Sequence, residues 1–352
     1  MLSQMDDFLV HQTYSTLDHV VDSDPRWYER YWFLIHDRAS GLSLGQGLGI
    51  YPNMNVMDGW AIVTLDGAQH NLRVSRELWH DRGDINVGPL HSEISEPLRK
   101  WHLELEENPQ GFSYDLEFEA ACLPYELDPP HFRRRRNAVE TNMCHFDQSG
   151  LCRGKVTVGG QTFELKDDTC FAVRDRSWGV RSTVGGPQAS GQYFPSAWPS
   201  PRGNFCVLHF PDFHLAYLGG EMVDGTRSFA GGIVYGFDDE RSPRRVTDVE
   251  REIHFEQERF TGADIIVHSA HEDPLRLSVK RLDCVYLRGG AYAGIDGYYQ
   301  GMPRGPEHME GETWDLTDVA TLRKIDGIND FVVECRLGDQ VGYGVFELYY
   351  QL

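Results

Sequence analysis

Hydrophobic and polar residues alternate with a period of two along much of the chain. The segment FSYDLEFEA, residues 112–120, places aromatic and aliphatic side chains on one face and polar side chains on the other. WHLELE at residues 101–106 and REIHFE at residues 251–256 repeat this alternation. A period of two is typical of strands with one buried face. The pattern therefore predicts antiparallel strands.

Turn-forming pairs divide these strands at short intervals. Asp66-Gly67, Gly159-Gly160 and Asp224-Gly225 each separate two alternating runs and predict tight hairpins. Helical periodicity is confined to two short segments, residues 94–101 and 317–325. The chain is therefore predicted to be all-β, built as sandwiches or barrels with few short helices.

A weak internal sequence similarity indicates two units. HFDQSG, containing Gln148, and GYYQGM, containing Gln300, lie about one domain length apart. DPPHFRRRRN, residues 128–137, is rich in proline and arginine and is interpreted as a loop that precedes the HFDQSG strand. We therefore expect an N-terminal unit over residues 1–165 and a C-terminal unit over residues 166–352.

The net charge limits the classes of binding partner, and the cysteine content indicates the cellular compartment. The formal net charge of −21 disfavours nucleic acid and anionic membrane surfaces. The N-terminal MLSQMDDFLV lacks the features of a secretory signal, and no apolar run is long enough for stable membrane insertion. Seven cysteines without a C-x-x-C pair favour a reducing compartment. We expect a cytoplasmic protein that is a monomer or a homodimer.

Motifs for common cofactors are missing from the sequence. It contains no phosphate-binding loop and no nucleophile elbow, and GQGLG at residues 45–49 lacks the spacing of a dinucleotide fingerprint. His268 and His271 have a spacing that suits a helix, but their segment reads as a strand entering a turn. We therefore expect neither a metal nor an organic cofactor.

RDRSWGVR, residues 174–181, concentrates charge around a tryptophan. Two interpretations stay open: a buried cluster of ion pairs that joins two β-units, or a site in which Asp175 is an acid or base and Trp178 walls an apolar cavity. A guanidinium could stack on the indole, and Asp175 could pair with Arg181. As a strand, the segment would divide into two faces: Arg174, Arg176 and Trp178 on one, and Asp175, Ser177 and Arg181 on the other.

Two further segments carry candidate residues. GQYFPSAWPS supplies Tyr193, Phe194 and Trp198, either as an aromatic-lined loop at a barrel mouth or as simple packing. In NFCVLHFPDFH, alternation places His209 beside apolar neighbours, where loss of water would lower its pKa and make it a neutral base. A satisfied structural histidine is the alternative.

The segment LGIYPNMNVMDGW carries Tyr51 and Asp58 among apolar residues. Asp58 is interpreted as half of a hairpin turn with Gly59, and both Tyr51 and Asp58 are also candidates for substrate binding.

RDRSWGVR, preceded by HFDQSGLCRGKVTVGG, resembles the aspartate–histidine–serine–tryptophan–glycine signature of the tandem lipocalin-like superfamily. This superfamily includes carotenoid 1,2-hydratases (hydroxyneurosporene synthases), AttH-like proteins, kievitone-hydratase-type proteins and fungal lipocalin-like Diels–Alderases. The similarity in layout covers nearly the whole chain. It implies two tandem lipocalin-like antiparallel β-barrels, packed together, with a cavity for a hydrophobic molecule. Relatives generally act without a metal or organic cofactor.

The resemblance also assigns roles to residues. The signature falls on Asp175, Ser177, Trp178 and Gly179, but Arg176 occupies the position of its histidine. Arginine cannot shuttle a proton near neutral pH. If that histidine does acid–base work in relatives, the role is either vacant here or has moved to Asp175, His145 or His209.

We therefore predict a cofactor-independent hydratase, dehydratase or isomerase. It would act on a small hydrophobic substrate, an isoprenoid-type alcohol or alkene such as a terpene, carotenoid or steroid-like molecule, through a carbocation-like state. A non-catalytic carrier of a lipophilic metabolite is the alternative. Asp175 is the predicted acid, and His209 and Tyr193 would position water or the hydroxyl. The predicted substrate-binding residues are Trp178, Arg176, Tyr51, Asp58, His145, Phe194 and Trp198.

Overall fold

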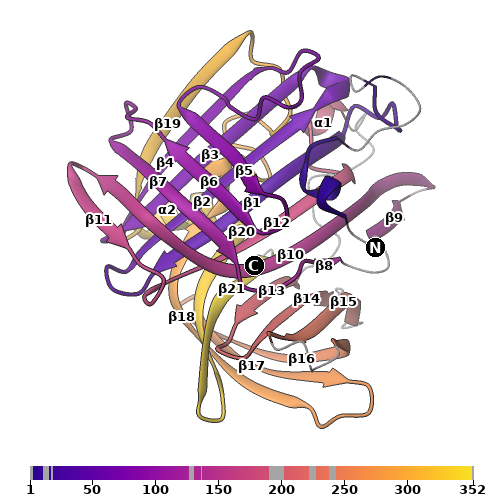
Figure 1. The fold of residues 1–352 in the computed structure, drawn as a ribbon, viewed down its shortest axis with the longest axis vertical. Helices are drawn as coiled ribbons and strands as arrows, with labels where there is room; N and C mark the ends of the chain where they lie inside the picture. The colour runs from indigo at the N-terminus through magenta and orange to yellow at the C-terminus, as the bar shows by residue number, and fades with distance from the viewer. Residues whose placement is uncertain are drawn as a thin grey trace.

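A computed structural model of the chain describes residues 3–10, 16, 19–126, 131–135, 137–189, 202–221, 227–237 and 243–350. Within these ranges the structure is almost entirely β, with two curved units side by side (Figure 1). The short helices are α1 (Gly186–Ala189), α2 (Val319–Ile325), and the 3-10 helices η1 (Gln4–Asp7), η2 (Pro52–Met54) and η3 (Leu287–Gly290). None of the helices in the described ranges is long and apolar enough to cross a bilayer.

The first unit is a curled sheet that resembles half of a barrel. Its strands run in the order β19-β4-β3-β2-β1-β12-β10-β7-β6-β5, and β8, β9 and β11 also pair with the long strand β10. The strands are β1 (Trp27–Asp37), β2 (Leu42–Tyr51), β3 (Val56–Leu65), β4 (Ala68–Glu77), β5 (Leu90–Glu96), β6 (Lys100–Leu105), β7 (Phe112–Ala120), β8 (Tyr125–Glu126), β9 (His131–Arg135), β10 (Ala138–Val158), β11 (Gln161–Leu165), β12 (Cys170–Val180) and β19 (Glu307–Asp315).

The second unit is a closed antiparallel barrel. The predicted fold class, with two packed lipocalin-like units and few short helices, is confirmed. The barrel strands are β13 (Arg202–His209), β14 (Phe213–Glu221), β15 (Arg227–Gly236), β16 (Arg244–Glu256), β17 (Arg259–Ser269), β18 (Leu275–Tyr286), β20 (Ile328–Leu337) and β21 (Gln340–Tyr350).

Apolar side chains form three layers. One core fills the curled sheet, a second fills the closed barrel, and a third lies between the two units. The central strand β1 shows why the third exists: Phe33 contributes to the first core, whereas its neighbours Trp32 and Leu34 belong to the layer between the units. Because both faces of β1 are covered, every residue of the strand is buried, including its charged residues.

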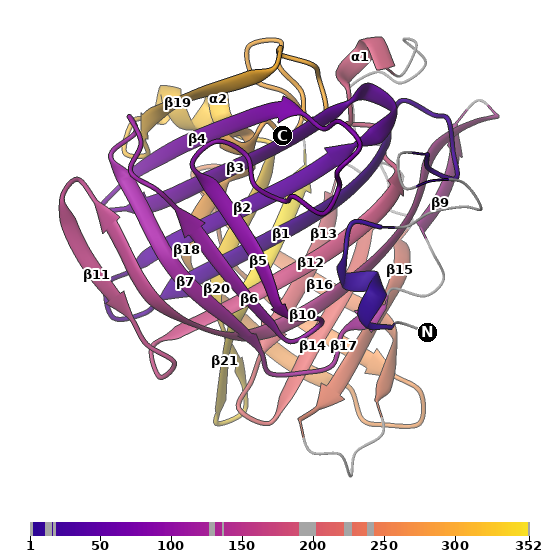
Figure 2. The same ribbon diagram turned by 45° about the horizontal axis from the view of Figure 1, so that its top comes forward.

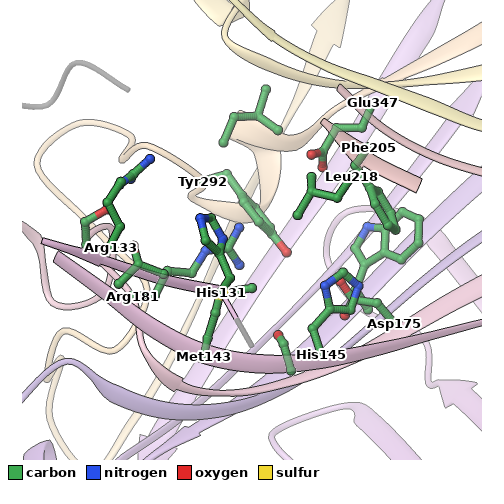
Figure 3. Close-up of a pocket in the computed structure, with 15 residues that line it drawn as sticks. His131, Arg133, Met143, His145, Asp175, Arg181, Phe205, Leu218, Tyr292 and Glu347 are labelled. Atoms are coloured by element: carbon green, nitrogen blue, oxygen red, sulfur yellow. The ribbon is translucent and has the colours of Figure 1, made fainter. Parts of the chain in front are cut away.

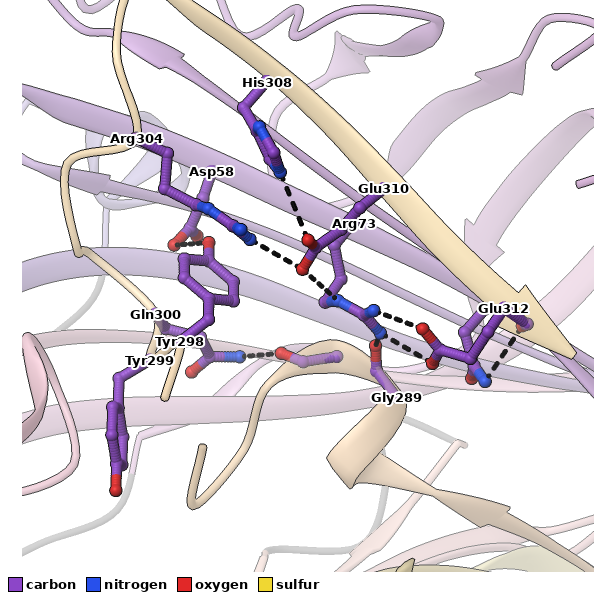
Figure 4. A network of polar contacts seen from close by, with 12 residues as sticks. Asp58, Arg73, Gly289, Tyr298, Tyr299, Gln300, Arg304, His308, Glu310 and Glu312 are labelled. Atoms are coloured by element: carbon purple, nitrogen blue, oxygen red, sulfur yellow. Dashed lines mark hydrogen bonds and ion pairs between the residues drawn. The ribbon is translucent and has the colours of Figure 1, made fainter. Parts of the chain in front are cut away.

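Strand β19 comes from the second half of the chain but completes the edge of the first sheet beside β4 (Figure 2). Arg73 of β4 fastens it: its Nε lies 3.0 Å from a carboxylate oxygen of Glu310, and its other nitrogens reach Glu312 (Figure 4). Arg73 Nη1 also donates to the carbonyl of Gly289, at 2.8 Å. The two units are therefore joined by a shared strand as well as by packing.

The predicted division at residue 165 stays a prediction. The strand order places β12, which follows that position, in the first sheet, together with β19. Gln148 lies in β10 and Gln300 in the irregular segment after η3, so these two glutamines do not occupy equivalent positions.

Two predicted hairpins and one predicted helix are confirmed. Gly159-Gly160 joins β10 to β11, Asp66-Gly67 joins β3 to β4, and residues 317–325 contain α2. Asp224-Gly225 lies outside the described residues.

Three local predictions are wrong. Residues 94–101 form the end of β5, a turn and the start of β6, because the apolar side chain of Trp101 is drawn into the first core. The predicted loop over residues 128–137 contains β9, whose backbone pairs with β10 although its side chains show no apolar alternation. Asp58 lies within β3 and not in a turn, because the chain reverses earlier at η2, where Asn55 adopts a positive φ of 55°.

Candidate active site

A small, partly open cavity of about 70 Å³ lies between the two units (Figure 3). Its walls come from β1, β10 and β12 of the first sheet, from the outer face of the barrel, and from the segment after η3. The cavity is therefore not the interior of either barrel. Its polar lining includes His145, Asp175, Ser177, Arg181, Tyr292 and Glu347, and its aromatic lining includes Trp32 and Phe205.

Alternation along β12 sends Asp175 and Ser177 into this cavity. Burial, and to a lesser extent the nearby Asp147 carboxylate, raise the pKa of Asp175 to about 6, although His145 and Arg181 act in the opposite direction. No ion pair joins Asp175 to Arg181 in the described part of the chain, and Asp175 Oδ1 has no hydrogen-bond partner there. Asp175 is therefore half-buried, with a pKa of about 6, and its covered Oδ1 can accept a hydrogen bond from a ligand.

His145 lies beside Asp175 on the neighbouring strand β10, where it pairs with Ser177 in the ladder. Its Nε2 lies 2.5 Å from Oδ1 of Asp147, and both side chains are nearly fully buried. Burial works to lower the pKa of His145, but the Asp147 carboxylate outweighs it and raises the pKa to about 9. At neutral pH the imidazole is thus protonated. Its Nδ1 has no partner among the described residues.

A second carboxyl pair lies across the cavity, on the outer face of the barrel. Glu347 of β21 and Asp330 of β20 are directly opposite in the ladder and share a hydrogen bond between their side chains. Trp32 Nε1 donates to Asp330 Oδ2 at 3.1 Å. Burial raises the pKa of both carboxyls, that of Glu347 to about 7. Asp330 is buried and Glu347 is half-buried, and two neighbouring carboxyls in such a place share a proton because both cannot ionise cheaply.

Tyr292 follows η3 and its side chain points into the cavity (Figure 3). The guanidinium of Arg30 lies 4.9 Å from its ring centre and that of Arg181 lies 5.8 Å away. Burial raises the pKa of this phenol, so it stays protonated and can donate a hydrogen bond.

The other face of β12 does not reach the cavity. Arg174 Nη1 lies 2.9 Å from Asp7 Oδ1, and both side chains are completely buried. Arg176 Nη2 lies 2.5 Å from Glu29 Oε2, and its guanidinium lies 5.2 Å from the Trp178 ring centre, as the predicted stacking requires. Both interpretations of RDRSWGVR therefore hold in part. One face of the strand forms an ion-pair cluster inside the curled sheet, and the other face borders the cavity.

The ion-pair cluster also fixes the N-terminal segment. Tyr31 donates its hydroxyl to the carbonyl of Asp7 at 2.5 Å, and Arg176 Nη2 donates to the carbonyl of Phe8 at 2.9 Å. Gly179, near the end of β12, has a φ of 125°. A Cβ at this position would lie 2.1 Å from the carbonyl oxygen of Asn142. The β10 backbone therefore lies directly against this glycine.

Tyr51 and Asp58 form a separate buried network behind Tyr292. Arg30 Nη2 donates to the Tyr51 hydroxyl at 2.8 Å, which in turn donates to Asp58 Oδ1 at 3.0 Å. Asp58 Oδ2 accepts from the backbone of Gly301 at 2.6 Å, and Tyr298 also reaches it (Figure 4). Neither Tyr51 nor Asp58 lines the cavity, because these partners occupy their polar atoms.

His209 also lies away from the cavity. Its Nδ1 is 3.1 Å from Ser149 Oγ, which also contacts His214 Nδ1 at 2.9 Å. Burial lowers the pKa of His209 to about 4, as the apolar neighbours predicted. This geometry fits a structural histidine. Three other candidates, Tyr193, Phe194 and Trp198, lie outside the described residues.

Four residues of the site were not among the predicted site residues: Asp147, Tyr292, Asp330 and Glu347. A signal was present for Asp147, since a spacing of two on a strand places it on the same face as His145. Asp330 and Glu347 are acidic residues inside apolar strands, which is costly unless they are paired or functional. In the described ranges no group of three or more histidine, cysteine or acidic residues is arranged to hold a metal ion.

A family model described as a family of unknown function (DUF8625) matches residues 2–350. The chain belongs to this family. A search of curated proteins by sequence found no match.

Solved structures share the fold of this member of the family. An AttH-like protein from Nitrosomonas europaea aligns with a TM-score of 0.57 at 11% identity, over 97% of this chain and 98% of that protein. Kievitone hydratase from Nectria haematococca aligns with a TM-score of 0.52 at 11% identity, over 98% and 97% of the two chains. The structure of CghA with Sch210972 aligns with a TM-score of 0.51 at 11% identity, over 93% of this chain and 89% of that protein. At this identity the likeness establishes the fold alone.

Proposed function

We propose that this protein is a cofactor-independent acid–base enzyme that adds water to a carbon–carbon double bond or removes it. One observation carries the proposal: Asp175 and His145 border the same cavity with pKa values of about 6 and about 9. At neutral pH one is a carboxylate and the other an imidazolium, which suits a base and an acid. The shared fold with a kievitone hydratase supports hydration chemistry.

In the dehydration direction, His145 Nδ1 donates a hydrogen bond to the substrate hydroxyl. The proton moves to that oxygen as the carbon–oxygen bond breaks, and water leaves with the bonding electron pair. Asp175 then takes a proton from the adjacent carbon, and the electrons of that bond form the alkene. In the hydration direction the roles reverse, so protonated Asp175 acts as the acid that the sequence analysis predicted.

The walls of the cavity suit a carbocation-like state. Trp32 and Phe205 present aromatic rings that line the cavity, and positive charge on carbon is attracted to such faces. Trp178, which was predicted to wall an apolar cavity, lies on the other face of β12 and does not line this one. The Glu347–Asp330 pair, which retains negative charge while sharing a proton, adds to the attraction.

The size of the cavity bears on the substrate. Sites that enclose a whole drug-sized ligand usually measure about 300–1,000 Å³, whereas the described residues enclose about 70 Å³ here. We therefore propose that the cavity receives only the reacting carbinol or alkene end of an isoprenoid-type molecule. A carrier must cover most of its ligand, so this cavity supports catalysis better than carriage.

Oxygen exchange tests this proposal without knowledge of the natural substrate. Purified protein is incubated in oxygen-18-labelled water with linalool-type, steroid-type and hydroxycarotenoid alcohols, and products are followed by mass spectrometry. An enzyme that makes and breaks the carbon–oxygen bond will place label in the alcohol and form the matching alkene. Recovery of an unchanged, copurified ligand with no exchange in any alcohol would support the carrier instead.

Activity should follow a bell-shaped pH profile. In the dehydration direction, kcat/KM falls below about pH 6 as Asp175 takes up a proton, and above about pH 9 as His145 loses one. Steady-state rates between pH 5 and 10 check this expectation. In Asp147→Asn the alkaline limb should move toward lower pH, because the neighbouring carboxylate raises the pKa of His145. An unmoved alkaline limb would remove His145 from the mechanism.

A further inference from the structure

A second cavity, of about 380 Å³, opens at one end of the closed barrel beneath α2. Phe260, Phe331 and Leu322 give it an apolar floor and wall, and Tyr286 lies at its side. Asn329 and Asp330 are consecutive residues of β20 that point in opposite directions. Asn329 lines this cavity, whereas Asp330 pairs with Glu347 on the outside of the barrel. The two cavities are thus separated by the barrel wall.

Arg281 places a positive charge in this cavity. It projects from β18, where it is opposite Val333, a residue of the barrel core. Its guanidinium lies 5.3 Å from the ring centre of Phe331, and Nη1 donates one long hydrogen bond, 3.4 Å, to the carbonyl of Phe260. Within the described ranges Arg281 forms no ion pair, although the rim acid Glu258 lies 3.6 Å from Arg323. A cation on an aromatic floor without a counter-ion attracts an anion.

Asn329 contributes an unused acceptor. The residue is 1% exposed, and its Nδ2 donates to Asp326 Oδ1 at 2.6 Å. Its Oδ1 is buried and has no hydrogen-bond partner among the described residues. A buried carbonyl without a partner costs free energy, and a hydroxyl or N–H group of a ligand would remove that cost.

We propose that this barrel mouth binds an amphipathic organic carboxylate that also carries a hydroxyl group. The carboxylate pairs with Arg281, the hydroxyl donates to Asn329 Oδ1, and the apolar body lies on Phe260, Phe331 and Leu322. The site is independent of the cavity between the units and requires no chemistry there. It is a binding site for a second small molecule.

Calorimetric titration with 3-hydroxydecanoate tests the proposal. Arg281→Gln should weaken binding at least about tenfold, as expected for loss of a charge-assisted contact. Arg276→Gln serves as the matched control, since Arg276 lies on the same strand but is exposed. It should bind like the unaltered protein. Decanoate should bind more weakly than 3-hydroxydecanoate because it cannot donate to Asn329, and 1-decanol should bind more weakly still.

Thermal melts confirm that each variant is folded before titration. The proposal is overturned if 3-hydroxydecanoate does not bind, if folded Arg281→Gln binds it unchanged, or if 1-decanol binds equally well. It is also overturned if Asp175→Asn abolishes binding, because the ligand would then occupy the cavity between the units. Retained binding in Asp175→Asn, together with loss in Arg281→Gln, supports two separate sites.

Discussion

Asp175→Asn is expected to lower turnover by roughly 10²–10⁴-fold, the usual contribution of a positioned acid–base group. The amide fits the same space but neither accepts nor donates the proton that the reaction moves. The measurement is the rate of oxygen exchange or alkene formation with the best alcohol found in the screen. Unchanged turnover in the folded variant would remove Asp175 from the mechanism.

The same substitution is expected to stabilise the fold at neutral pH. The pKa of Asp175 is about 6 in the folded protein, against an ordinary value of 3.8. Because ionisation is harder in the folded state, the wild-type protein loses stability as pH rises from about 4 to 6, and the cost is full above 6. Relief of this cost is worth about 3 kcal/mol, since the shift is about two pKa units and one unit corresponds to about 1.4 kcal/mol.

Denaturant unfolding of Asp175→Asn and wild type at several pH values between 4 and 8 checks this second effect. The advantage of the variant should grow with pH up to about 6 and then level off. Asp115→Asn is the control, because Asp115 is exposed and pairs with His102 on the outside of the first sheet. A strongly destabilised Asp175→Asn would instead assign Asp175 to the structural ion-pair cluster.

Arg174→Met is expected to destabilise the protein by about 3–5 kcal/mol, as for other buried pairs that lose one partner. Arg174 and Asp7 are both fully buried, so the substitution leaves the Asp7 carboxylate uncompensated. Gln148 Oε1, which accepts from Arg174 at 2.9 Å, also loses a partner. The free energy of unfolding from denaturant titration gives the effect.

A double-mutant cycle isolates the pair. Arg174→Met combined with Asp7→Leu should be clearly less destabilised than the sum of the two single variants, because no charge stays buried alone. Arg153→Met is the surface control: Arg153 lies 2.6 Å from Glu117 but is 42% exposed, so its loss should cost about 0–1 kcal/mol. Additive effects at Arg174 and Asp7 would contradict the proposed coupling.

Local patterns carried much of the information about the fold. Alternation and glycine pairs located strands such as β7 and the β10–β11 hairpin, because one-sided burial and tight turns are decided within a few residues. The pattern failed at β9, whose HFRRR sequence shows no apolar face, since backbone pairing with β10 holds it in place. It also failed at residues 94–101, where Leu98 N donates to Asp7 Oδ2 and a distant residue thereby supports the turn.

The candidate site, too, was predicted only in part from the sequence. The two faces of β12 followed from the sequence, and Asp175 and His145 were both selected. His209 was selected as well, but its partners Ser149 and His214 lie beyond the cavity. Glu347, which is paired with Asp330, and the phenol Tyr292 border the same cavity as Asp175 only because the barrel and the segment after η3 pack against the first sheet.

The sequence by itself determined the all-β class, the strand that carries Asp175 and the separation of its two faces, because side-chain direction along a strand depends only on residue parity. Only the tertiary structure decided which face borders a cavity, which carboxyls meet there, and which arginine face binds the N-terminal segment. These depend on pairing and packing between strands distant in the chain. Burial raises the pKa of Asp175, whereas the Asp147 carboxylate raises that of His145 against the effect of burial.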